Sequence, residues 1–182
     1  MENFNKEEEI QRLLENLPAQ KMEMEATVPS MGKFYTLKDA SLPITVRPMK
    51  YEDEREIADA RKRGADPINI LLERCVSNID IQQLFLIDKL ALLIKIREAT
   101  YGEEYNIKTQ CLKCHTDTRL LLNINRDLIL RTLPEDMEDP REIELPLLKK
   151  SLKVRMPKLR DEEYLTGHND IYSNLWRFVQ DI

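Results

Sequence analysis

The sequence is poor in the residues that catalytic sites usually need. It has two histidines, three cysteines and four glycines among 182 residues. With so few glycines there is no phosphate-binding loop, and neither histidine stands in a spacing typical of a catalytic triad or a metal hydrolase. No carboxylate is expected in an apolar setting that would tune its pKa for acid–base catalysis. These shortages argue against an enzyme.

Other shortages exclude whole classes of partner. The chain has 28 Lys and Arg against 33 Asp and Glu, a net charge of −5, so it lacks the cationic excess that nucleic acid binding needs. Its most hydrophobic run, residues 84–96, contains charged residues and is too short to span a bilayer. The N-terminus shows no signal-peptide core, and the cysteines form no disulfide framework. We expect a protein of a reducing cytoplasm that binds neither membranes nor nucleic acid.

What is present favours helices. Hydrophobic residues make up 42% of the chain and charged residues 34%, a mixture that suits an α+β, mainly helical fold. We predict central buried helices with small β-hairpins, one of which carries a Cys-x-x-Cys knuckle. The expected divisions are residues 1–27 (an amphipathic helix and linker), 28–165 (a mixed core that includes a knuckle hairpin over 105–124) and 166–182 (a C-terminal helical segment).

The first amphipathic helix is predicted over residues 5–17. Ile10, Leu13, Leu14 and Leu17 share one stripe at helical spacing. The spacing leaves two interpretations open, since the stripe could dock on its own core or on another protein.

The central segments carry ordinary start and stop signals. A Pro- and Gly-containing turn over 28–35 is expected to lead into a strand whose hairpin partner is 42–47. A charged helix follows over 51–62, with Glu52-Asp53-Glu54 as a solvated start. Asp66 and Pro67 begin a helix that reaches residue 78, and Asp80 begins a long buried helix that ends before Gly102. Strands are expected over 105–109 and 118–124, and a loop over 133–146.

One short pattern occurs twice. Residues 46–54 are echoed by residues 154–162: a strand ends at Val-Arg, a proline breaks it, and acidic residues open a helix. We predict two similar strand-then-helix units whose hairpins pair into one small sheet. Chance is the alternative, because proline followed by acidic residues is common at helix starts.

Cys111 and Cys114 have the spacing of a metal knuckle. Two such thiolates supply half of a structural zinc site, and Cys75, His115 and His168 are the remaining candidates for ligands. Cys75 has apolar neighbours that suggest core packing instead. Covalent haem and a thioredoxin-like redox pair are less favoured, since there is no export signal and strands flank the motif on both sides. A tight hairpin turn that has lost its metal is the fourth interpretation.

The C-terminal region concentrates large apolar side chains. Tyr172, Leu175, Trp176 and Phe178 form a candidate partner surface, because aromatic anchors are frequent at the centres of interfaces. Packing within the same domain is the alternative.

Several short motifs occur together in one order. They are Pro29-Ser30-x-Gly32 leading to Tyr35, Val46-Arg47-Pro48, Asp88-x-Leu90-x-Leu92-Leu93-x-x-x-Arg97, Tyr101-Gly102 and Cys111-x-x-Cys114. This order resembles the baseplate hub subunit family of T-even-like contractile-tailed bacteriophages, over residues 28–164. The family more often has a proline after the first cysteine and a glycine after the second, where this chain has Leu112 and His115.

The resemblance implies a non-enzymatic hub protein or hub assembly factor. Its partners would be other hub or tape-measure proteins, in the host cytoplasm during assembly and in the tail baseplate of the virion. The expected cofactor content is none or one structural zinc on Cys111 and Cys114. The alternative from another class is a cytosolic zinc- or redox-binding adaptor whose knuckle carries the function.

Overall fold

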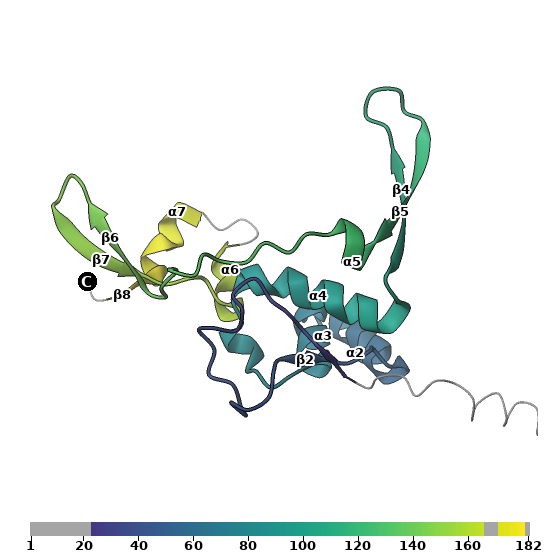
Figure 1. Cartoon of the computed structure of the whole chain (residues 1–182), viewed down its shortest axis with the longest axis horizontal. Coiled ribbons are helices and arrows are strands. Elements are labelled where there is room, and N and C mark those ends of the chain that lie inside the picture. The colour runs from purple at the N-terminus through teal and green to yellow at the C-terminus, as the bar shows by residue number, and fades with distance from the viewer. Residues whose placement is uncertain (1–22, 166–170, 181–182) are drawn as a thin grey trace, which may run out of the picture.

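The computed structural model describes residues 23–165 and 171–180, so the helix predicted over 5–17 lies outside the described residues. The long helix α4 crosses the middle of the molecule, and two hairpins extend from opposite ends of it (Figure 1). In chain order the elements are β1 (Met24–Glu25), β2 (Thr45–Val46), α2 (Tyr51–Lys62), α3 (Pro67–Cys75), β3 (Val76–Ser77), η1 (Ile81–Gln83), α4 (Leu86–Tyr101), β4 (Glu104–Gln110), β5 (Asp117–Asn123), α5 (Ile124–Asp127), β6 (Arg141–Leu145), β7 (Lys150–Val154), η2 (Leu159–Asp161), α6 (Glu162–Leu165), α7 (Ile171–Asn174), η3 (Leu175–Phe178) and β8 (Val179–Gln180).

The first sheet has the order β1-β2-β3, with both pairs antiparallel. The expected strand 42–47 is present as β2, but its hairpin partner lies before the 28–35 turn, at β1, and not after it. That prediction was wrong because Met31 and Gly32 both have positive φ, which turns the chain away from an extended path. The residues of β3 were predicted to end the helix that begins after Asp66. They form a strand instead, since Val76 pairs with Val46.

The helices follow their sequence signals closely. Helix α2 spans the predicted residues 51–62, and Asp66 accepts from the amide of Ile68 at 2.8 Å, with Pro67 at the first turn of α3. Asp80 caps the short helix η1 instead of α4, which begins at Leu86. Helix α4 ends before Gly102, whose φ of 84° suits glycine, as predicted.

Two strands confirm the predicted arms around the cysteine pair. β4 and β5 pair antiparallel over seven residues each, from Glu104–Asn123 to Gln110–Asp117. The predicted loop over 133–146 is wrong in part, because residues 141–145 form β6, which pairs with β7.

The sheet β6-β7-β8 repeats the arrangement of the sheet β1-β2-β3. In each sheet the middle strand ends at Val-Arg and pairs with a strand that returns after helical segments: Val46 with Val76, and Val154 with Val179. The amide of Arg47 donates to the carbonyl of Cys75, and the amide of Arg155 to that of Phe178, each at 2.9 Å. The duplicated unit is therefore confirmed in geometry. The two units form separate sheets within the described residues, so the prediction of one shared sheet was wrong.

The core lies between the first sheet, α3 and α4. Its fully buried members include Leu72, Cys75, Leu84 and Leu92, and Leu159 of the second unit joins them. Cys75 is thus a core residue, as its apolar neighbours predicted. Over residues 23–165 and 171–180, helices combine with three small antiparallel sheets, which is an α+β fold.

Candidate interaction site

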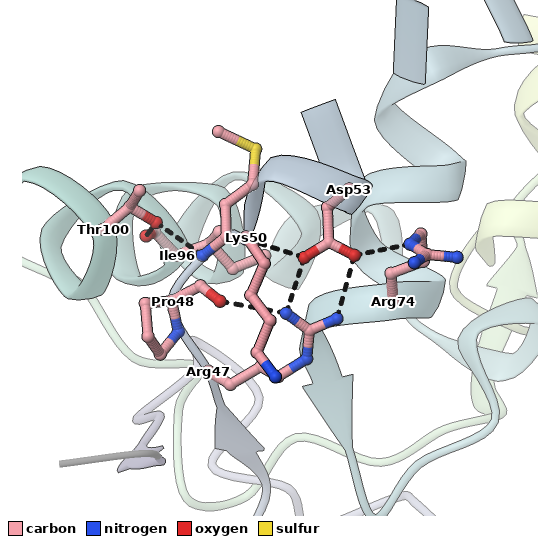
Figure 2. A network of polar contacts seen from close by, with 8 residues as sticks. Arg47, Pro48, Lys50, Asp53, Arg74, Ile96 and Thr100 are labelled. Atoms are coloured by element: carbon pink, nitrogen blue, oxygen red, sulfur yellow. Dashed lines mark hydrogen bonds and ion pairs between the residues drawn. The ribbon is translucent and has the colours of Figure 1, made fainter. Parts of the chain in front are cut away.

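A buried carboxylate holds the first unit together (Figure 2). Asp53 is 1% exposed and accepts from Arg47 through both guanidinium nitrogens, at 2.6 and 3.0 Å, and from Nε of Arg74 at 2.5 Å. The amide of Lys50 also donates to it, at 2.8 Å. The hydrogen bond from Arg47 holds the pKa of Asp53 well below its usual range, so the carboxylate stays charged. The expectation of a solvated acidic helix start was wrong at this position.

The second unit contains the same pair. Arg155 donates to Asp161 at 2.6 and 3.0 Å, and the amide of Lys158 donates to the same carboxylate at 2.8 Å. The register places Arg177 where the first unit has Arg74, but here the guanidinium lies over the ring of Tyr164, 3.9 Å from its centroid. The repeated pair fixes the angle between strand and helix in both units. Among the described residues, no second arginine pairs with Asp161 as Arg74 pairs with Asp53.

A second buried carboxylate, Asp88, joins the start of α4 to the 28–35 turn. It accepts from the amide of Ser30 at 2.9 Å, from the Ser30 hydroxyl, and from the Tyr35 hydroxyl at 2.5 Å. Tyr35 Oη in turn accepts from the amide of Phe85 at 2.9 Å. Burial, and then the neighbouring Asp88, raise the pKa of Tyr35, which keeps its hydroxyl protonated as a donor.

The Asp88 network was missed by sequence reasoning, which foresaw no carboxylate in a buried setting. The signal was present in the chain. Pro29-Ser30-x-Gly32, Tyr35 and the aspartate that opens α4 were noticed only as parts of an ordered set of motifs. The structure shows that these motifs are contact partners.

Arg97 fixes the base of the β4–β5 hairpin. Its guanidinium donates to the carbonyls of Gly102 and Glu104, at 2.5 and 2.6 Å, and lies 4.6 Å from the ring centroid of Tyr105. A guanidinium group is planar and has several N–H donors, so it can hydrogen-bond two carbonyls and lie against an aromatic ring at the same time. The hairpin therefore leaves the body in a direction set by the end of α4.

The second unit is attached at the start of α4. The amide of Leu86 donates to the carbonyl of Pro157 at 3.1 Å, and the amide of Leu159 to that of Leu84 at 2.7 Å. Lys89 adds an ion pair with Glu162 at 2.7 Å. The start of α4 thus carries the second unit with its β6–β7 hairpin, and the end of α4 carries the β4–β5 hairpin.

The outer face of α4 is exposed, which corrects the prediction of a buried helix at this face. Leu90 is 65% exposed and Ile87 is also exposed. Together with the segment 124–131, this face forms an apolar groove of about 600 Å³, which we call the α4 groove. It is lined by Thr27, Pro29, Ile87, Leu90, Ala91, Ile94, Lys95, Ile124, Asn125, Leu128, Ile129, Leu130 and Arg131.

The two hairpins also present apolar side chains to solvent. Leu112 at the β4–β5 turn is 96% exposed, and Leu147 at the β6–β7 turn is 95% exposed. Leu120 and Leu121 of β5 are exposed on opposite faces of their strand, since side chains alternate. Both faces of the β4–β5 hairpin therefore carry uncovered apolar surface.

Cys111 and Cys114 lie in the β4–β5 turn. The amide of His115 donates to the carbonyl of Cys111 at 2.8 Å, and His115 has a φ of 55°, at the position where glycine would relieve the backbone. Hydrogen bonds with the side chain and backbone of Thr116, and with Cys111, lower the pKa of Cys114 to about 7. Among residues 23–165 and 171–180 no group of three candidate ligands gathers. A zinc site on Cys111 and Cys114 stays a prediction, and from this chain's described residues it would have two ligands.

Only part of the predicted C-terminal surface is exposed. Tyr172, Leu175 and Trp176 are exposed. Phe178 is 5% exposed and packs beneath Arg155, whose guanidinium lies 5.3 Å from the ring centroid. Phe178 is therefore a core residue of the second unit, which corrects its place in the expected surface. Ile10, Leu13, Leu14 and Leu17 lie outside the described residues.

The motifs brought together by this fold can be compared with known families. Residues 19–180 match the family described as T4 bacteriophage base plate protein. The chain belongs to this family. No curated protein and no solved structure matches the chain. Membership confirms the resemblance at the level of the phage baseplate.

In a member of the T4 bacteriophage base plate protein family, the exposed groove and hairpins are candidate surfaces for contacts with other proteins. A baseplate protein works beside other phage proteins, and membership suggests a structural or assembly role. Within the described residues, no helix combines the length and the apolar character needed to cross a bilayer.

Proposed function

We propose that this chain is a non-enzymatic component or assembly factor of the baseplate hub that binds hub or tape-measure proteins through its projecting hairpins. It would act in the host cytoplasm during assembly and take its place in the tail baseplate of the virion. Membership in the base plate protein family supports the location, and the exposed apolar surface supports binding as the activity.

The observation that carries the proposal is the β4–β5 hairpin. It pairs over seven residues a strand and stands clear of the body (Figure 1). An isolated two-stranded hairpin is only marginally stable in water, and a third strand or a covering surface is usually needed. Arg97 secures the base of this hairpin but leaves its outer length uncovered. A partner that packs on it would supply the missing cover.

The hairpin offers two kinds of contact to such a partner. The outer edges of β4 and β5 have no neighbouring strand among the described residues, so their main-chain groups can pair with an added strand. Leu120 and Leu121 can fill apolar pockets on either face of it. Exposed Tyr172 and Trp176 at the other end of the molecule supply anchors for a second contact.

The experiment is a pull-down of tagged protein from phage-infected cells, with the co-purifying chains identified by mass spectrometry. Leu120→Asp places a charge on the hairpin, whereas Leu42→Asp places the same charge on an equally exposed leucine of a loop. We expect hub or tape-measure proteins with the unaltered chain and with Leu42→Asp, and their loss with Leu120→Asp. Circular dichroism checks that both variants stay folded. Recovery of host proteins alone, or equal recovery with both variants, would refute the proposal.

A further inference from the structure

The α4 groove is apolar and uncovered, and it is distinct from the hairpins that the proposed function uses. We propose that residues 5–17 of the same chain lie in the α4 groove as an amphipathic helix and cover Leu90 and its neighbours. The alternative occupants are a second copy of the chain and another protein. Three properties of the groove and of the chain favour the chain's own segment.

The first property is where the chain enters the structure. Thr27 and Pro29 are themselves part of the groove wall. Leu17 stands ten positions before Thr27, and ten extended residues span about 33 Å. Helix α4, with 16 residues, is about 24 Å long. The segment can therefore reach any part of the groove, and a tether this short gives it an effective concentration in the millimolar range, well above that of a second copy.

The second property is shape. Ile10, Leu13, Leu14 and Leu17 have the spacing with which an amphipathic helix enters a hydrophobic groove. A helix over residues 5–17 would be about 20 Å long, and the part of α4 that lines the groove, residues 87–95, is about 14 Å long. Four apolar side chains along one stripe thus match the length of the apolar wall.

The third property is charge. Residues 5–17 contain four glutamates against one lysine and one arginine. In the part of the chain that the structure describes, the charged side chains that line the groove are Lys95 and Arg131, and both are basic. Lys95 already pairs with Glu98 at 2.7 Å, so Arg131 is the side chain best placed to meet the acidic face of the incoming helix.

The test is photo-crosslinking of the full chain with benzoylphenylalanine at position 90. Leu90 is exposed, so the change does not disturb the core. The protein is prepared as an equal mixture of isotopically light and heavy chains, and crosslinked peptides are identified by mass spectrometry. We expect position 90 to be joined to residues 5–17, with both peptides carrying the same label. Peptides of mixed label would show a second copy in the groove and overturn the proposal, as would crosslinks to other segments or none at all.

Two controls make the result specific. The same photoreactive residue at Tyr51, which is exposed on α2 away from the groove, should give no crosslink to residues 5–17. Leu14→Asp puts a charge in the predicted apolar stripe and should lower the docking equilibrium constant at least about tenfold, the effect expected from removing one buried leucine side chain, with a corresponding fall in the yield at position 90. Glu15→Gln, on the opposite face of the predicted helix, should leave most of the yield. An unchanged yield with Leu14→Asp would overturn the proposal.

Discussion

Replacing Asp53 by asparagine tests how much of the fold depends on one buried carboxylate. The substitution keeps the size of the side chain but removes the charge that neutralises Arg47 and Arg74. Breaking a buried ion pair costs about 3–5 kcal/mol, because the remaining charge is left without its partner. Both guanidinium groups are partly exposed and can recover solvent, so we expect the lower end, about 3 kcal/mol.

The assay is equilibrium unfolding by urea and by heat. A loss of about 3 kcal/mol corresponds to a fall in Tm of roughly 6–12 °C for a chain of this size. The matched control is Asp59→Asn on the same helix, which breaks an exposed pair with Lys62 and should leave the unfolding midpoints close to those of the unaltered chain. If Asp53→Asn destabilises the protein no more than Asp59→Asn, the reasoning is refuted.

The effect of Asp53→Asn on the free energy of unfolding should depend on pH. The pKa of Asp53 is depressed in the folded state, so the stabilisation is fully present above the unfolded pKa, about 4, and is lost as the pH falls through the folded value. The difference in unfolding free energy between the unaltered chain and Asp53→Asn should therefore be constant from pH 7 to about 5 and narrow below about 4. A difference that widens on acidification would contradict the sign.

Three further outcomes follow from other contacts. Tyr35→Phe removes a donor to Asp88 and the acceptor for the Phe85 amide, so it should lower the free energy of unfolding in urea by about 1–3 kcal/mol. A loss within about 0.5 kcal/mol, the range usual for surface substitutions, would rule out a stabilising role for the network. Arg97→Met should speed proteolytic cleavage within residues 104–123 without changing the free energy of unfolding of the body. Equal cleavage rates in the variant and the unaltered chain would show that the hairpin base needs no guanidinium. Alkylation of native protein should modify Cys114 with a half-maximal rate near pH 7 and spare buried Cys75, and Thr116→Val should move that midpoint upward; a midpoint near 9 in the unaltered chain would contradict the hydrogen bonding at the turn.

Local chemistry made much of this fold predictable from the sequence. Helix α2, the Asp66–Pro67 start of α3 and the stop at Gly102 depend on residues within one helical turn of each other, so their signals are complete in a short window. The repeated Val-Arg-Pro pattern was visible for the same reason. Its consequence, a buried Arg–Asp pair in each unit, also lies within six residues.

What sequence reasoning missed depends on distant partners. Val76 and Ser77 continue a helical pattern, but they become β3 because Val46 and Thr45 offer a strand edge. Asp88 looked like an ordinary polar position on a helix until Ser30, 58 residues earlier, supplied its donors. The apolar run of α4 predicted a buried helix, and nothing local to that run could show that one face would stay uncovered among the described residues.

The repeated Arg–Asp pair also bears on the order in which the chain folds. Each pair joins residues six positions apart, whereas the contact between Gln83 and Lys158, where the two units meet, joins residues 75 positions apart. Contacts between near neighbours cost little loop entropy and form early, while those of large sequence separation form late. We therefore expect the two units to become ordered separately and to dock at the start of α4 as the last step. In refolding kinetics, Lys158→Met should then change mainly the unfolding rate, and substitutions at Asp53 the folding rate.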